Sequence, residues 1–342
     1  MKKLIDKLET EKNLEREEFK TLLTCEDDYL HERARAVRES FFGNQIYMRG
    51  LIEFTNYCKN DCYYCGLRCG NSDVVRYRLT FEQILECCAE GHELGFRTFV
   101  LQGGEDPYYT DDMLADLCST IKEKFPDCAI TLSLGERSYD SYKRLFDAGA
   151  DRYLLRQETS SDEHYSMLHP PEMTLSARKK CLWDLKEIGY QVGCGFMVGS
   201  PGQTLDHLVD DLFFIKELDP AMVGIGPFIP HKSSQFAEEK QGELRLTLNC
   251  LAILRLMKPN LLLPATTALG TIEETGREMG VLAGGNVVMP NLSPLDAREK
   301  YMLYDNKICT DDGARKCRGC IARRMKKIGC EIAITRGDYV HV

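Results

Sequence analysis

The chain has 342 residues, 43% of them hydrophobic, which suffices for one large α/β domain or two small ones. Its formal net charge of −9 is opposite in sign to that of most proteins that bind nucleic acids or anionic membranes, although residues 315–327 form a local basic patch. The first 20 residues have no apolar stretch typical of a signal peptide, and no run approaches the roughly 18 apolar residues of a membrane span, so we expect a cytoplasmic protein that binds neither nucleic acid nor a membrane.

Residues 1–43 space their apolar side chains as helices do and predict an N-terminal helical extension. From residue 44 to residue 290, short apolar runs alternate with turns and helical patterns. The predicted strands are Ile46–Phe54, Thr98–Gln102, Ala129–Leu134, Arg152–Arg156, Gln191–Val198, Met222–Ile225, Leu261–Thr266 and Asn286–Met289. The predicted helices include Thr80–Leu94, Asp111–Lys124, Ser138–Ala148, Ser176–Ile188, Leu205–Glu217 and Leu244–Met257. Eight strand–helix units favour a closed, parallel (β/α)8 TIM barrel, because parallel neighbours need a crossover connection, although an open sheet would have the same periodicity.

Residues 291–342 are polar and cysteine-bearing, with little strand pattern beyond Glu331–Ile334, and we expect them to form an extension packed against the barrel. The sixteen cysteines do not indicate a disulfide scaffold in so long a chain without a secretion signal. Five of them lie in helical patterns, where a free cysteine behaves as a small apolar residue. These are Cys87, Cys88, Cys118, Cys181 and Cys250.

Three cysteines, Cys58, Cys62 and Cys65, cluster directly after the first predicted strand. Their C-x3-C-x2-C spacing allows one loop to bring three thiolates, the soft ligands that iron–sulfur clusters prefer, to a single cubane. A missing fourth thiolate would leave one iron open to a small molecule. The alternatives are a zinc site completed by Cys69 and three unrelated thiols.

This spacing, with Tyr64 before the third cysteine, resembles the signature of the radical S-adenosylmethionine (SAM) superfamily. The resemblance implies a 4Fe–4S cluster on Cys58, Cys62 and Cys65 whose open iron is chelated by the amino and carboxylate groups of SAM. It also implies that an electron from a low-potential donor cleaves the C5′–S bond of SAM, which gives a 5′-deoxyadenosyl radical at the mouth of the barrel.

Motifs at the ends of later strands agree with this resemblance. Gly103 and Gly104 resemble the turn that receives the SAM amino group, although two glycines after a strand are often only a turn. Arg156 and Glu158, two apart, would point the same way and hold polar groups of SAM, unless they form a structural salt bridge. Residues 195–204 resemble the strand that faces the adenine, or else form a plain strand–turn–helix.

Longer stretches resemble the HydE family of FeFe-hydrogenase maturases. They are Ile52–Cys58, Val100–Tyr109, Asp151–Thr159, Met222–His231 and Pro264–Thr271, and the similarity runs from about Ile46 to Cys320. The resemblance implies a role, together with the maturases HydF and HydG, in building the diiron subcluster of the hydrogenase active site. The implied substrate is an Fe(CO)2(CN)–cysteine complex made by HydG.

The same resemblance assigns residues to the two ligands. For SAM they are Tyr64, Gln102, Gly103, Gly104, Glu105, Thr131, Ser133, Arg156, Glu158, Arg178, Met197 and Tyr301. For an anionic substrate they are Arg49, Arg156, Thr266, Thr267 and Met289. Threonine hydroxyls can bind cyanide or carboxylate, and a buried arginine needs an anionic partner. An ordinary structural role is the alternative for each of these residues.

A second cysteine triplet, Cys309, Cys317 and Cys320, stands near the C-terminus with the spacing C-x7-C-x2-C. Some HydE proteins carry an accessory 2Fe–2S or 4Fe–4S cluster on this spacing, and the resemblance implies the same here. A zinc site or free thiols are the alternatives, and Cys330 would be the candidate for a fourth ligand.

Two rival functions remain at this point. Methylornithine synthase, a lysine mutase, resembles HydE over much of its length, and biotin synthase is a more distant relative. A non-catalytic iron–sulfur protein is a different class, but such proteins usually give the cluster four protein ligands, and the first motif offers three.

Overall fold

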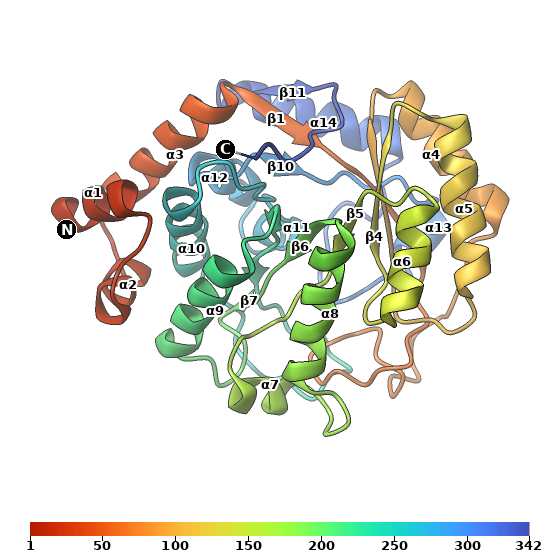
Figure 1. The fold of residues 1–342 in the computed structure, drawn as a ribbon, viewed down its shortest axis with the longest axis horizontal. Coiled ribbons are helices and arrows are strands. Elements are labelled where there is room, and N and C mark those ends of the chain that lie inside the picture. Colours follow the sequence, from red (N-terminus) through yellow and green to blue (C-terminus); the bar gives the residue numbers. More distant parts are fainter. Residues whose placement is uncertain (342) are drawn as a thin grey trace.

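The computed structural model describes residues 1–341, and its centre is a parallel sheet of six strands surrounded by helices (Figure 1). The strands of this sheet follow one another in chain order, and the order skips only β7 (Met197–Val198), which belongs to another sheet. They are β2 (Gly50–Thr55), β3 (Thr98–Gly103), β4 (Ala129–Ser133), β5 (Arg152–Leu154), β6 (Gln191–Cys194) and β8 (Met222–Val223).

Isolated bridges continue this sheet into a closed ring. Met222 pairs with Leu262, Pro264 pairs with Val287 in β10 (Val287–Val288), and Asn291 pairs with Leu51 in β2. The ring confirms the predicted barrel. The predicted seventh strand, Leu261–Thr266, makes only these bridges and is not a regular strand, because Pro264 has no N–H to donate to a ladder.

The first predicted strand is divided into β1 (Gln45–Met48) and β2, with Arg49 at the break. β1 pairs with β10 on one side and with β11 (Glu331–Ala333) on the other, whereas β2 pairs with β3. The division brings the C-terminal segment into contact with the first strand of the barrel.

Helices cover the outside of the ring, and five of those predicted from the sequence start at a serine or threonine whose side chain accepts a backbone N–H of the first turn. These five are α4 (Phe81–Glu93), α5 (Asp111–Lys124), α6 (Tyr139–Asp147), α8 (Leu175–Ile188) and α9 (Leu205–Leu218). Their caps are Thr80, Thr110, Ser138, Thr174 and Thr204. Local capping therefore explains why the helices predicted at these positions begin within one residue of the expected place.

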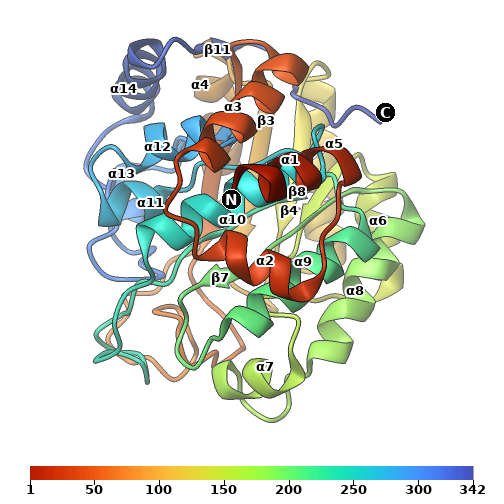
Figure 2. The ribbon, with the colours of Figure 1, turned by 90° about the vertical axis from the view of Figure 1, so that its left-hand side faces the viewer.

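The N-terminal helices α1 (Lys2–Glu11), α2 (Arg16–Leu23) and α3 (Tyr29–Phe42) pack against the outside of α9 and α10 (Leu244–Met257) (Figure 2). α10 is buried along almost all of its length, because these helices cover it on one side and the barrel on the other. Within the described residues, no helix combines the length and the hydropathy needed to cross a membrane.

The sequence patterns did not predict several elements. They are α7 (Asp162–Leu168), β9 (Gly226–Pro227), α11 (Thr267–Ile272), α12 (Gly276–Leu282), α13 (Leu295–Arg298) and α14 (Ala314–Lys327), and β7 (Met197–Val198) is the separated end of a predicted strand. β7 pairs with β9 beyond the end of the main sheet, so the predicted strand Gln191–Val198 is interrupted after Cys194.

Candidate active site

The first cysteine triplet lies on an irregular loop, residues 56–77, which we call the cysteine loop and which follows β2. The loop is fixed from two sides: Tyr63 N–H donates to Leu168 O at the end of α7, and Gly66 N–H donates to Leu303 O in the C-terminal segment. All three thiols are half-buried.

Burial has the same electrostatic effect on all three thiols. It raises the pKa of Cys58, raises that of Cys62 further, and raises the pKa of Cys65 to about 12. Thiolates are therefore unfavourable here unless a positive metal centre compensates their charge. Buried core cysteines such as Cys118 share this shift, so it is the three soft thiolate donors on one loop that fit an iron–sulfur cluster.

The spacing of the sulfur atoms disfavours zinc. Among residues 1–341, the one group with three donor atoms all within 4.8 Å of one another is His92, Asp127 and Cys128. One tetrahedral zinc, with Zn–S bonds of about 2.3 Å, would hold its sulfurs roughly 3.8 Å apart. The triplet is spread more widely than that, and Cys69, the candidate fourth ligand, is exposed.

The two glycines at the end of β3 lie against the cysteine loop. A Cβ atom on Gly104 would come within 2.2 Å of Tyr57 O and 2.7 Å of Cys58 Cβ, and one on Gly103 within 2.6 Å of Thr55 Cγ2. Lys59 N–H donates to Glu105 O at 2.9 Å. Gly103 and Gly104 therefore do not form an ordinary turn, because their backbone packs against the cysteine loop and forms one wall of the candidate cluster site.

A cavity of about 370 Å³ opens at the mouth of the barrel beside Cys65. The register of the sheet explains part of its lining, because Glu53, Gln102 and Ser133 stand side by side on β2, β3 and β4. Twelve residues singled out from the sequence line it. They are Tyr64, Cys65, Gln102, Gly103, Ser133, Arg156, Glu158, Arg178, Met197, Thr266, Thr267 and Tyr301.

The polar groups of this cavity are only partly matched to one another. Arg156 Nη2 and Glu158 Oε2 lie 2.8 Å apart as an ion pair, but they are not aligned as a hydrogen bond. Arg156 Nε and Thr266 Oγ1 are buried and have no hydrogen-bond partner among the described residues. Glu158 also has a positive φ of 68°, a strained conformation for a residue other than glycine. Unmatched groups beside an apolar wall are what a zwitterionic ligand needs.

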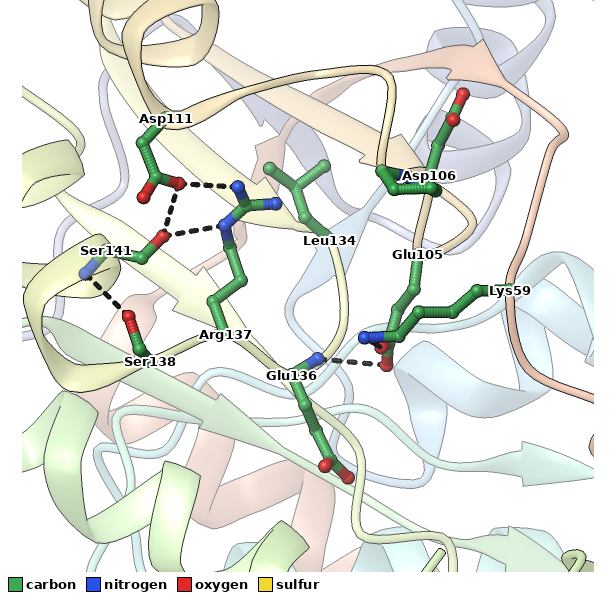
Figure 3. A pocket seen from close by; sticks show the side chains of 10 residues that line it. Lys59, Glu105, Asp106, Asp111, Leu134, Glu136, Arg137, Ser138 and Ser141 are labelled. Carbon is green, nitrogen blue, oxygen red and sulfur yellow. Dashed lines mark hydrogen bonds and ion pairs between the residues drawn. The ribbon is translucent and has the colours of Figure 1, made fainter. Parts of the chain in front are cut away.

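Glu105 lies outside this cavity, in a smaller pocket of about 270 Å³ that Figure 3 shows from close by. Its carboxylate accepts Glu136 N–H at 2.9 Å and pairs with Lys59 Nζ at 3.3 Å. Arg178 forms an ion pair with Glu136 and donates Nη1–H to Arg156 O at 2.9 Å, so it lies between the two pockets.

Arg49 and Thr131 lie deeper in the barrel, apart from the other predicted ligands. They line a narrow space together with Arg152 and Met222. Arg49 is 1% exposed, its pKa is lowered by burial, and Thr131 Oγ1 has no partner among residues 1–341. Thr131 lies one side-chain level below Ser133 on the same strand, which explains the separation.

Met289 does not line either space. It packs against Met222, Leu262 and Val287 in a small apolar cluster. The five residues predicted to bind an anion are therefore not a single group: Arg156, Thr266 and Thr267 are at the mouth, Arg49 is below them, and Met289 is in the apolar packing. Thr266 also caps α11 and Thr267 begins it, so neither residue lies on a strand.

Sequence reasoning missed a buried ion pair in the cavity wall. Lys307 Nζ lies 2.6 Å from Glu53 Oε1, and Asn291 Nδ2 donates to Glu53 Oε2 at 2.8 Å. A lone glutamate in an otherwise apolar strand was a readable signal for Glu53. Lys307, in an irregular segment, carries no such signal.

The second triplet has two cysteines one turn apart on α14, Cys317 and Cys320, and one on the preceding loop, Cys309. A hydrogen bond from Cys317 and the Arg277 guanidinium, 3.7 Å away, lower the pKa of Cys309, whereas the same hydrogen bond and burial raise the pKa of Cys317. Cys330 lies beyond the other end of α14, about 10 Å or more along the helix axis from Cys320, and does not complete a set of four.

The family model of the radical SAM superfamily matches residues 52–215, the part of the barrel that carries both the cysteine loop and the Gly–Gly turn. Fold and site together define a radical SAM enzyme, a class whose members bind a 4Fe–4S cluster and SAM.

Three relatives narrow the assignment. The FeFe-hydrogenase maturase subunit HydE of Thermotoga maritima is 43% identical over 96% of this chain and 94% of its own length. The 3-methylornithine synthase of Methanosarcina barkeri is 30% identical over 92% of this chain and 89% of its own length. A crystal structure of methylornithine synthase superposes with a TM-score of 0.84 at 28% identity, covering 96% of this chain and 97% of that one. The chain belongs to the HydE family of hydrogenase maturases. The alternative, a methylornithine synthase, is not favoured, because the identity to that relative is 30% and the identity to HydE is 43%.

Proposed function

We propose that this enzyme acts on a small iron complex carrying CO, cyanide and cysteine, supplied by HydG, during assembly of the diiron subcluster of FeFe-hydrogenase. The observation that supports this most directly is the pair of unmatched polar groups, Arg156 Nε and Thr266 Oγ1, in a cavity that begins at Cys65. Family membership gives the reaction class, and these groups give the substrate its polar contacts.

In this proposal Cys58, Cys62 and Cys65 hold the cluster. A cluster held there would supply the electron that cleaves the C5′–S bond of SAM. The backbone of Gly103 and Gly104 would receive the amino group of SAM. The other residues assigned to SAM contacts are Tyr64, Gln102, Glu105, Thr131, Ser133, Arg156, Glu158, Arg178, Met197 and Tyr301.

In this proposal the residues have different tasks. Arg156, Glu158, Gln102, Ser133 and Met197 line the cavity and would bind SAM directly. Arg178 donates a hydrogen bond to the backbone oxygen of Arg156 and so fixes the position of Arg156. Glu105 forms an ion pair with Lys59 and so fixes the cysteine loop. Thr131 lies deeper than the other residues assigned to SAM, in the narrow space beside Arg49.

Apolar side chains keep water from the reacting atoms. Leu154, Leu155, Phe228, Ile229 and Leu303 contribute to the same wall. A water-poor cavity protects a carbon-centred radical and strengthens every charge–dipole contact inside it. Thr266 and Thr267 offer hydroxyl donors to cyanide or carboxylate, and Arg49 offers a buried cation below them.

The proposal includes partners and a second metal site. HydG would supply the substrate, HydF would receive the product, and a low-potential protein would supply the electron. Cys309, Cys317 and Cys320 would hold an accessory iron–sulfur cluster, 2Fe–2S or 4Fe–4S, because Cys309 and Cys317 are hydrogen-bonded neighbours beside the Arg277 guanidinium and Cys320 lies one turn further along α14.

The first prediction compares the two triplets. With anaerobically reconstituted protein and dithionite, we expect Cys62→Ser to abolish formation of 5′-deoxyadenosine, because the cluster loses one of three ligands. Cys317→Ser should retain most of the activity, and Cys250→Ser, in the buried core, is the control for loss of a thiol alone. Equal loss in Cys62→Ser and Cys317→Ser would contradict the division of roles.

The substrate assignment has its own test. Wild-type protein is incubated with SAM, reductant and either the iron complex or isotope-labelled lysine. We expect 5′-deoxyadenosine formation to be coupled to consumption of the iron complex, with labelled lysine recovered unchanged. Rearranged lysine would replace the maturase proposal with a mutase.

A further inference from the structure

Arg76 lies at the end of the cysteine loop and donates hydrogen bonds to four backbone carbonyl groups of that loop. Nη1 donates to the oxygens of Asn56 and of Leu67, the latter at 2.8 Å. Nη2 donates to the oxygens of Arg68 at 2.8 Å and Asn71 at 3.2 Å. One guanidinium therefore satisfies four acceptors in a segment that has no regular secondary structure of its own.

The four acceptors lie on both sides of the cysteines. Asn56 precedes Cys58 by two residues, and Leu67 follows Cys65 by two. Arg76 thus joins the entry of the triplet to its exit and sets the distance between them. A planar fork with five donors can do this, whereas the single ammonium of a lysine cannot reach four carbonyls in such different directions.

The surroundings hold Arg76 in place. The side chain of Asn56, fully buried, donates to Val75 O at 2.9 Å and accepts Tyr77 N–H at 2.7 Å, so both neighbours of Arg76 are fixed. Asn71 Nδ2 donates in turn to Gly66 O at 2.7 Å, directly after Cys65.

Arg76 also differs from the nearby arginines in its charge balance. Arg68 pairs with Asp61 at 2.8 Å and Arg78 with Asp106 at 2.7 Å. Among residues 1–341, no carboxylate lies within ion-pair distance of Arg76. Its positive charge is held by neutral carbonyls and faces the Tyr57 ring, and two of those carbonyls, on Asn56 and Leu67, are two residues away from Cys58 and Cys65 in the chain.

We propose that Arg76 is a positioning residue of the cluster site, a role that rests on the proposed function only in so far as the triplet binds a cluster. Its guanidinium holds the cysteine loop in the conformation that directs Cys58, Cys62 and Cys65 to one metal centre. Its uncompensated charge makes the cluster easier to reduce, because the charge near a cluster is one of the factors that set its potential.

Two variants separate the effect of the guanidinium hydrogen bonds from the effect of the positive charge. Arg76→Lys keeps the charge and loses the planar guanidinium, and Arg76→Met loses both. Arg97 is the control for loss of an arginine elsewhere: its Nη1 donates to His92 O at 3.1 Å and Phe96 O at 2.8 Å before β3, and its Nε pairs with Asp127 at 2.7 Å, at the end of the barrel away from the cysteine loop. Arg97→Met removes the same group next to Cys128, a buried core thiol that belongs to neither cysteine triplet.

The first readout uses metal-free protein and hydrogen–deuterium exchange. We expect exchange in peptides from residues 56–77 to be at least about tenfold faster in both Arg76 variants, because loss of one net charged hydrogen bond is of that order. Peptides from β3 to β6 should exchange as in the wild type, which shows that the barrel is folded. Unchanged exchange in residues 56–77 in Arg76→Lys would overturn the positioning role.

The second readout is the midpoint potential of the reconstituted cluster, followed by paramagnetic resonance. We expect a more negative potential in Arg76→Met than in Arg76→Lys, with Arg97→Met equal to the wild type. Equal potentials in the two Arg76 variants would overturn the role of the charge. If the wild-type spectrum did not change on addition of SAM, the proposed function would fail, whereas exchange in the metal-free protein would still decide the role of Arg76.

Discussion

Gly104 shows how much of the site depends on a residue without a side chain. Its φ is not in the left-handed region, so glycine is not required by backbone conformation. It is required by space, because a Cβ would lie 2.2 Å from Tyr57 O, a backbone atom of the cysteine loop. The turn and the loop therefore fit together only as long as this position stays bare.

The second prediction is the effect of Gly104→Ala. The methyl group must push the backbone of Tyr57 and Cys58 away by about 1 Å, and a displacement of that size at reacting groups costs about 100-fold in rate. We expect 5′-deoxyadenosine formation to fall by about this factor, with a changed paramagnetic spectrum of the cluster. The control is Gly313→Ala, where a Cβ would meet nothing within 4 Å. A Gly104→Ala enzyme with wild-type rate and spectrum would show that the loop has room to move.

For single residues of the site, the sequence predicts a role only where the interacting residues are close together in the chain. The three cysteines and the two glycines form short motifs, so their chemistry is readable from spacing alone. Lys307 meets Glu53 across 254 residues, and only the fold shows that they pair. Arg76 binds within its own loop, but its targets are backbone carbonyls, which leave no trace in residue types.

Among the elements, α9 holds the ends of two barrel strands together through one carboxyl group. Asp211 Oδ1 accepts hydrogen bonds from Gln157 Nε2 at 3.1 Å and Ser160 Oγ at 2.8 Å, just after β5. Gln157 Oε1 accepts Gly195 N–H at 2.9 Å, after β6. Asp211 is fully buried, and its Oδ2 has no partner among the described residues, so this oxygen is where a proton can reside.

The third prediction follows from the protonation of Asp211. Burial raises its pKa to about 7, whereas an unfolded aspartate titrates near 3.9. Between these values the unfolded chain has released a proton that the folded chain still holds, so the free energy of unfolding falls as the pH rises. Between pH 5 and pH 7 we expect a loss of about 2–3 kcal/mol from this group. The contribution is fully present below about pH 4.

The measurement is urea unfolding of metal-free protein at pH 5, 6, 7 and 8, for the wild type and Asp211→Asn. The amide cannot ionise, so the variant should lack this part of the decline, while every other titrating group is common to both proteins. Parallel pH profiles would mean that Asp211 ionises as easily in the fold as outside it.

The accuracy of the predicted elements also depends on whether the interactions that define an element are local in the sequence. Helices with a threonine or serine cap are placed within one residue, because capping is local. The seventh strand is misread, because an apolar run around Pro264 has the composition of a strand but cannot complete a ladder. α11 and α12 are missed because they are only six and seven residues long.

At the scale of the whole molecule, the number of strand–helix units predicts the barrel, and the family resemblance predicts which residues lie at its mouth. The opposite end of the barrel was not predictable. Residues 335–340 cross beneath it and contribute ligands to buried arginines: Arg152 Nη2 lies 2.6 Å from Asp338 Oδ1 and donates to Arg336 O at 2.9 Å. Nothing in this polar tail indicates such a partner, because Arg152 is 184 residues away from Arg336.

The last prediction is that residues 335–340, the tail that closes this end of the barrel, stabilise the fold. Arg152 is 2% exposed, and Thr98 Oγ1 and Gln191 Oε1 are its remaining hydrogen-bond partners. Removal of Asp338 leaves a buried guanidinium without its carboxylate, but Asp338 is itself 38% exposed, so water screens the pair and the loss is about 1–3 kcal/mol. We expect Asp338→Ala, and truncation after Ala333, to lower the Tm of metal-free protein by about 2 °C or more, measured by circular dichroism.

Truncation after Val340 is the control, because it keeps the bond from Asn260 Nδ2 to Val340 O and every contact of Asp338. Below the transition, the iron content after reconstitution should equal that of the wild type in all three proteins, because the cysteine loop lies at the other end of the barrel. A tail whose removal left the Tm unchanged would be a passive cover. A tail whose removal also lowered the iron content would instead show that the two ends of the barrel are coupled, since β1, which pairs with β11, continues through Arg49 into the strand that carries the cysteine loop.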